Sequence, residues 1–126
     1  MPKSILIVED DDLLRDLTAE GLSSLYAVNI VACANADEAL DHLSHYKTPT
    51  LVVTDIHMPG HLDGIALAQE IWRRWPTLPV ILTSGDVVID ASQLPIHHTF
   101  LPKPWGIPDL ATMIGKITTL TRQGGW

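Results

Sequence analysis

Short apolar, β-branched runs alternate with amphipathic helical patterns five times along this chain of 126 residues. The first run, Ile5–Val8, is continuously apolar, which is typical of a strand that is buried on both faces of a parallel sheet. A repeated strand–helix order favours one parallel sheet with helices on both faces, joined by right-handed crossovers. The sequence therefore predicts a doubly wound α/β domain with five strands and five helices.

The predicted elements follow from periodicity and from the residues that stop it. Strands are predicted at residues 5–8, 27–32, 51–55, 79–83 and 99–104, and helices at about 12–24, 36–45, 64–75, a short or irregular one near 90–94, and one from about 107. The apolar side of the first helix is predicted to be Leu13, Leu14, Leu17, Leu22 and Leu25. The buried side of the third is predicted to be Ile65, Ala68, Ile71, Trp72 and Trp75.

Reactive side chains stand where four of the predicted strands end: Glu9 and Asp10, Asp55, Thr83, and Lys103. In an open parallel sheet these ends lie on one edge, where ligands bind. Three clustered carboxylates repel one another unless a cation lies between them, and oxygen ligands in a partly hydrated site suit Mg²⁺. The sequence therefore predicts a magnesium site that Lys103 adjoins.

This set of side chains points to phosphoryl transfer. An aspartate such as Asp55 can attack phosphorus and form an aspartyl phosphate, and the step requires mainly positioning and charge neutralisation. Each residue also has an ordinary explanation: Asp55 as a loop cap, Lys103 as a surface turn residue, and Thr83 as a common strand residue. Their joint occurrence at the ends of neighbouring strands favours a site.

Composition excludes several other classes of protein. The net charge is −7, from 8 basic and 15 acidic residues, which disfavours binding to nucleic acid or to an anionic membrane surface. Cys33 is the single cysteine, cannot form an intrachain disulfide, and is predicted to be a small buried residue. No signal peptide or membrane span is apparent, so we expect a cytoplasmic protein.

The chain resembles the receiver domain of two-component response regulators over nearly its whole length. The matching stretches are Ile5-Leu6-Ile7-Val8-Glu9-Asp10-Asp11, Val53-Thr54-Asp55-Ile56-His57-Met58-Pro59-Gly60 with Asp63-Gly64, Ile81-Leu82-Thr83-Ser84-Gly85, and Leu101-Pro102-Lys103-Pro104. The resemblance implies the flavodoxin-like strand order 2-1-3-4-5. It also implies a receiver domain over residues 1–122, followed by a flexible tail at 123–126.

The resemblance assigns a role to each site residue. Asp55 is the expected phosphoacceptor, and Mg²⁺ is the expected cofactor. Asp10 and Asp55 are expected to bind the metal directly, Glu9 through water, and His57 through its backbone carbonyl.

A second set of residues is expected to respond to the phosphoryl group. Lys103 contacts it, Thr83 supplies the switch hydroxyl, and Phe100 is the aromatic that swings inward. A cis peptide bond is expected between Lys103 and Pro104.

Two features depart from the family pattern. The segment between Thr83 and Lys103 is short and carries Pro95, Ile96, His97 and His98, whereas the family has a helix end that is rich in alanine and glycine. Trp105 stands where phenylalanine or tyrosine is more usual.

The expected function is to accept a phosphoryl group from a sensor histidine kinase or a histidine phosphotransfer protein. The response is expected at the face formed by the fourth helix, the fifth strand and the last helix, which would bind a downstream protein. No enzymatic activity is expected beyond self-phosphorylation and self-dephosphorylation at Asp55, and the chain is expected to be a monomer or weak homodimer.

Three alternatives remain open. The fold could serve as a phosphorylation-independent adapter, or the chain could be a receiver fragment of a longer hybrid kinase or regulator. An aspartate-nucleophile phosphatase of the haloacid dehalogenase type would need an acid two residues after Asp55, where His57 stands.

Overall fold

A computed structural model describes residues 3–56, 64–84, 98–102 and 106–118. A five-stranded parallel sheet contains β1 (Ser4–Val8), β2 (Asn29–Cys33), β3 (Leu51–Asp55), β4 (Val80–Ser84) and β5 (His98–Pro102). The helices are α1 (Asp12–Leu25), α2 (Ala36–His45), α3 (Gly64–Arg74) and α4 (Ile107–Ile117). The strand order is β2-β1-β3-β4-β5, which confirms the predicted topology.

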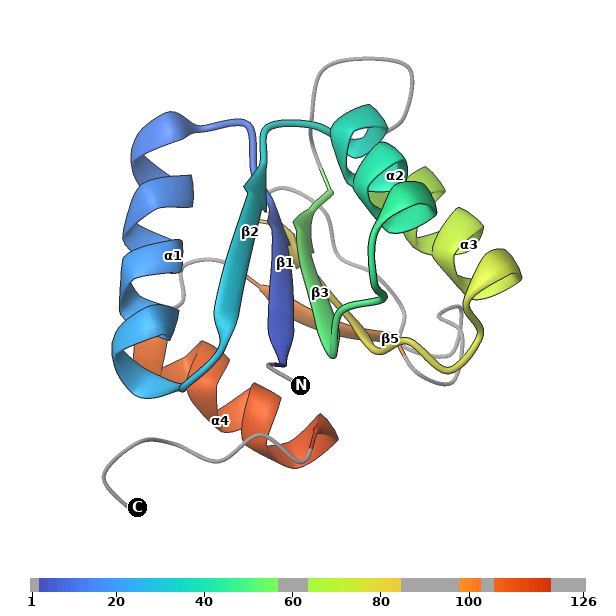
Figure 1. Ribbon diagram of the computed structural model, residues 1–126. Coiled ribbons are helices and arrows are strands. Elements are labelled where there is room, and N and C mark those ends of the chain that lie inside the picture. The colour runs from blue at the N-terminus through green and yellow to red at the C-terminus, as the bar shows by residue number, and fades with distance from the viewer. Residues whose placement is uncertain (1–2, 57–63, 85–97, 103–105, 119–126) are drawn as a thin grey trace.

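The helices cover both faces of the sheet, with α1 and α4 on one side and α2 and α3 on the other (Figure 1). Side chains alternate along the strands, so each face has its own apolar core. Leu6, Val52 and Leu82 face α2 and α3, whereas Ile5 and Val53 face α1 and α4. Burying each such side chain stabilises the fold by roughly 1.5–3 kcal/mol.

Local sequence sets the helix starts that lie nearest the sheet edge. Asp11 is the N-cap of α1 and accepts a hydrogen bond from the backbone N–H of Leu14 at 3.0 Å. Asn35 caps α2 in the same way, accepting from the N–H of Glu38 at 2.8 Å. Such caps satisfy backbone donors that would otherwise lack partners within the helix.

The predicted elements agree with the structure except at a few positions. The second strand was predicted at 27–32 but runs from Asn29, because β1 begins at Ser4 and its first Cα partner is Asn29. The last predicted helix is α4 of Figure 1. The fourth predicted helix, near 90–94, and the tail at 123–126 lie outside the described residues.

The predicted apolar side of the first helix was wrong at Leu13 and Leu17, which are 69% and 53% exposed. Helix α1 buries Thr18 and Leu22 instead. Positions 14, 18 and 22 share one side of a helix, and 13 and 17 lie about 100° around from it. Thr18 is accommodated because its hydroxyl donates to the Leu14 carbonyl at 2.7 Å.

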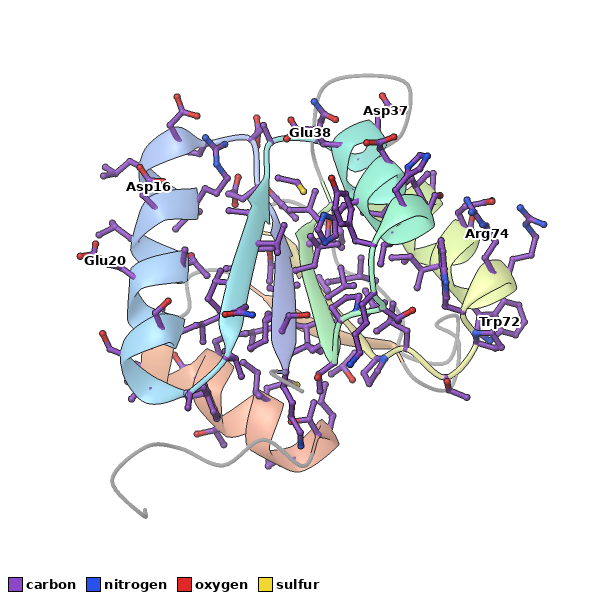
Figure 2. The ribbon with its side chains drawn as sticks, viewed as in Figure 1. Asp16, Glu20, Asp37, Glu38, Trp72 and Arg74 are labelled. Atoms are coloured by element: carbon purple, nitrogen blue, oxygen red, sulfur yellow. The ribbon has the colours of Figure 1, made fainter. Side chains whose placement is uncertain are left out.

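Trp72 was also predicted to be buried but is 49% exposed. Ala68 and Ile71 face the core, and the neighbouring position 72 points to the side. Trp75 is half-buried, and the guanidinium of Arg74 lies 4.4 Å from the centre of its ring. In Figure 2, Trp72 and Arg74 project from the end of α3.

A buried tyrosine joins α1 to α4. Tyr26 is 1% exposed, and its hydroxyl donates a hydrogen bond to the carbonyl oxygen of Ala111 at 3.0 Å. We expect Tyr26→Phe to lower the free energy of unfolding by about 1 kcal/mol, since a buried acceptor loses its donor. Urea denaturation would measure this loss. Tyr46→Phe is the matched control because Tyr46 is 65% exposed, and an equal effect of both substitutions would contradict the prediction.

Candidate functional site

The sheet register places the predicted site residues at one edge. Val8, the last residue of β1, is the Cα partner of Thr54 in β3, and Asp55 is the partner of Thr83 in β4. Glu9 and Asp10 follow β1 directly, so they emerge beside Asp55. The predicted convergence of strand ends is therefore confirmed for Glu9, Asp10, Asp55 and Thr83.

Three carboxylates come together at this edge. Glu9, Asp10 and Asp55 each offer one oxygen such that the three oxygens lie within 4.8 Å of one another. Glu9 and Asp55 are buried, at 6% and 7% exposure, whereas Asp10 is exposed. A set made only of carboxylate oxygens, open on one side to solvent, fits a hard cation such as Mg²⁺.

The turn after β1 holds the Glu9 backbone and carboxylate. The Glu9 N–H donates to the Cys33 carbonyl at 3.0 Å, which extends the pairing of β1 with β2 by one residue. The Asp11 N–H donates to the Glu9 carboxylate at 3.1 Å. A carboxylate that accepts a hydrogen bond from a backbone N–H is restrained in its orientation, so this contact helps to hold the Glu9 side chain at the edge.

The backbone after Asp55 is fixed by β4 and by the start of α3. The Ile56 N–H donates to the Thr83 carbonyl at 2.9 Å, and the Gly64 N–H donates to the Ile56 carbonyl at 2.8 Å. A Cβ at Gly64 would lie 2.0 Å from the Asp55 carbonyl oxygen and 2.7 Å from the Ile56 Cα. The sequence indicates Gly64 as part of the helix start and of a stretch that matches the family, but not that this close approach of the backbone requires glycine.

The predicted switch residues lie on neighbouring strands. Thr83 is buried at 2% exposure, and Phe100 is half-buried. In the β4–β5 register, Thr83 is the partner of Leu101, and Phe100 is the partner of Leu82. Phe100 packs with Leu82 against the core on the α2 and α3 side. The two predicted switch residues are thus one register position apart.

Several predicted residues lie outside the described ranges: His57, Lys103, Pro104 and Trp105. The expected metal contact of the His57 carbonyl, the phosphoryl contact of Lys103 and the cis peptide bond between Lys103 and Pro104 therefore stay predictions.

Cys33, the last residue of β2, is buried, as predicted. Burial, helped by the nearby carboxylate of Glu38, raises the pKa of the Cys33 thiol to about 11, although Arg15 acts in the opposite direction. The thiol is therefore protonated at neutral pH, which makes it a poor nucleophile and a poor metal ligand.

Comparison with known proteins gives a consistent result. A family model described as "Response regulator receiver domain" matches residues 5–115. The DNA-binding transcriptional regulator NtrC of Klebsiella pneumoniae is 34% identical over 125 residues, covering 92% of this chain and 25% of NtrC.

Solved structures agree. The receiver domain of the hybrid histidine kinase CckA has a TM-score of 0.73 and 31% identity, covering 90% of this chain and 96% of that one. NtrX from Brucella abortus has a TM-score of 0.80 and 32% identity, covering 93% of this chain and 27% of NtrX. The chain spans about a quarter of the length of the first curated relatives that it matches.

Proposed function

The chain belongs to the response regulator receiver domain family, and on that premise we propose that Asp55 accepts a phosphoryl group from a histidine of a sensor kinase or phosphotransfer protein. The supporting observation is the convergence of Asp55 with Glu9 and Asp10, whose oxygens lie within 4.8 Å of one another at the carboxyl edge of the sheet. Receiver domains are regulatory phosphoacceptors, so we propose no substrate turnover beyond gain and loss of this group.

Glu9, Asp10 and Asp55 would hold Mg²⁺, with the backbone carbonyl of His57 as a further proposed ligand. When bound, Mg²⁺ supplies positive charge that offsets the negative charge on the phosphoryl oxygens. An oxygen of Asp55 forms the new bond to phosphorus while the bond from phosphorus to the histidine nitrogen breaks. The electron pair of the broken bond leaves with the donor imidazole.

The proposed response begins at Thr83, the Cα partner of Asp55 on the neighbouring strand. Thr83 and Lys103 would contact phosphoryl oxygens, and Phe100 on the next strand would change its packing. The altered face would include β5 and α4 and would bind a downstream protein.

A second candidate is that the chain acts as the receiver part of a longer regulator or hybrid kinase. The curated relatives support this, since the match covers only 24–25% of their length. In either case residues 1–122 would form the receiver unit. Within the described residues, no helix has the length and apolar character required to cross a lipid bilayer. We propose a cytoplasmic location, where kinases and phosphotransfer proteins present phosphohistidine.

The test of the proposed function is the intact mass of the protein after incubation with acetyl phosphate, with Mg²⁺ and with EDTA. We expect a gain of one phosphoryl group that requires Mg²⁺. A panel of phosphorylated histidine phosphotransfer proteins would follow. If neither donor phosphorylates the protein, the phosphoacceptor proposal fails and the phosphorylation-independent adapter is favoured.

Leu13 and Leu17 are exposed on α1, the helix that begins two residues after Asp10, and we propose that they contact a protein donor. Asp16 and Glu20 project outward from the same helix (Figure 2), so this surface suits a partner with apolar and basic side chains. We expect the double substitution Leu13→Ser, Leu17→Ser to slow phosphotransfer from a protein donor about tenfold, because the interface loses buried apolar area.

Two controls accompany this prediction, a small-molecule phosphoryl donor and a substitution on another helix. The acetyl phosphate reaction of the double variant should be unchanged, since that donor needs no protein interface. Trp72→Ser removes another exposed apolar side chain, at the end of α3, and should slow neither reaction. Equal slowing with both donors would show that the α1 substitutions disturb the site and not an interface.

A further inference from the structure

Arg15 contacts both ends of the turn that carries Asp10. Its Nη1 donates to the backbone carbonyl oxygen of Glu9 at 2.9 Å, and its Nη2 is paired with the carboxylate of Asp12. The Arg15 side chain is 18% exposed, so the guanidinium is held against the turn. The Arg15 backbone N–H also donates to the Asp11 carbonyl at 2.9 Å, within the first turn of α1.

The first of these contacts affects Asp10 through the backbone. The Glu9 carbonyl belongs to the peptide bond that joins Glu9 to Asp10, and that unit is planar. Fixing its oxygen therefore restricts the position of the Asp10 Cα, from which the side chain leaves the turn. Asp10 is the exposed member of the three carboxylates, so packing restricts it less than Glu9 or Asp55.

We infer that Arg15 is a positioning residue for the divalent-cation site, acting through the Glu9 carbonyl to direct Asp10 toward Glu9 and Asp55. The inference rests on the proposed function, because it requires that the three carboxylates bind Mg²⁺. Arg15 itself touches neither the metal nor the phosphoryl group.

Because Arg15 is charged, loss of its charge and loss of its positioning role would change the metal affinity in opposite directions. A guanidinium near a cation site repels the cation, so loss of charge alone would tighten metal binding. Loss of positioning would weaken it, because the Asp10 carboxylate would sample orientations away from the site. Residues that orient metal ligands typically change metal affinity by about 10- to 100-fold when they are removed.

The experiment measures metal affinity of the whole chain with Mn²⁺ as the probe, counting free Mn²⁺ by electron paramagnetic resonance and displacing it with Mg²⁺. Arg15→Met should weaken both affinities about tenfold. Arg15→Lys keeps the charge but offers a single amine for two acceptors, and it should weaken them less. Arg73→Met is the matched control, since Arg73 forms an ion pair with Glu70 at the same helical spacing on α3.

The outcomes separate the inference from its premise. If Arg15→Met binds Mn²⁺ and Mg²⁺ as tightly as the wild type or more tightly, the positioning role is overturned. It is also overturned if Arg73→Met loses as much metal affinity as Arg15→Met. Urea denaturation shows whether each variant is folded under the binding conditions; a lower midpoint with wild-type affinity would assign Arg15 a purely structural role and also overturn the inference. If the wild-type chain binds no Mn²⁺ or Mg²⁺, the metal step of the proposed function fails together with the inference.

Discussion

Asparagine at position 55 is expected to reduce phosphoryl uptake below detection, both from acetyl phosphate and from a phosphohistidine protein. The amide has nearly the shape of the carboxylate but lacks the anionic oxygen that would bond to phosphorus. The fold should persist, because the substitution keeps the size of a buried side chain and removes one of three mutually repelling charges. Intact mass with a concurrent urea denaturation curve measures both expectations.

Two further variants separate loss of the acceptor from loss of a neighbouring charge. Asp10→Asn should lower metal affinity and the rate of labelling, yet Asp55 should still be labelled when Mg²⁺ is raised. Asp16→Asn changes an exposed aspartate on α1 and should leave labelling by acetyl phosphate unchanged, since that donor needs no protein interface. Persistent labelling of Asp55→Asn at the wild-type rate would contradict the assignment of Asp55.

Alanine at position 64 is expected to cause the largest loss of stability among the substitutions considered. The added Cβ would lie 2.0 Å from the Asp55 carbonyl oxygen. The oxygen belongs to the backbone and the Cβ is attached directly to it, so no side-chain rotation can relieve the overlap. The start of α3 or the end of β3 must shift, which we expect to cost about 3 kcal/mol. Urea denaturation measures the loss, and acetyl phosphate labelling should slow because Asp55 moves relative to Glu9 and Asp10.

The matched control for Gly64→Ala is Gly115→Ala. A Cβ at Gly115, which is exposed on α4, would meet no other atom within 4 Å. This substitution should raise the free energy of unfolding by up to about 1 kcal/mol, since alanine favours a helix more than glycine does. Equal midpoints for Gly64→Ala and the wild type would refute the steric argument.

The strand and helix pattern was sufficient to predict a parallel sheet and the edge where the acids meet, and the family resemblance supplied the strand order. Continuous apolar runs such as Leu51–Val53 have one good solution, a buried parallel strand, and the residue that follows the run must appear at the strand end. The strand pattern alone therefore places Asp55, Glu9 and Asp10 together. The family resemblance supplied their expected roles but not their burial, which differs between Glu9 and Asp10.

The sequence did not predict features that depend on how one segment packs against another. The leucine spacing in α1 fitted two sides of the helix, and periodicity alone does not say that Leu22 is buried while Leu17 is exposed. The contact of Gly64 with the Asp55 carbonyl arises from the path of the chain between β3 and α3. The contact of Arg15 with the Glu9 carbonyl depends on a rotamer, which no spacing rule specifies.

The strand order has a mechanical consequence for a switch built on this sheet. Strands β1 and β3, which carry the acids to the edge, are interior and each has a neighbour on both sides, whereas β5 closes the described sheet beyond β4. Displacing an interior strand would break two ladders of hydrogen bonds, but moving β5 strains one. A proposed switch could therefore move β5 while the strands that carry the three acids keep their pairing on both sides.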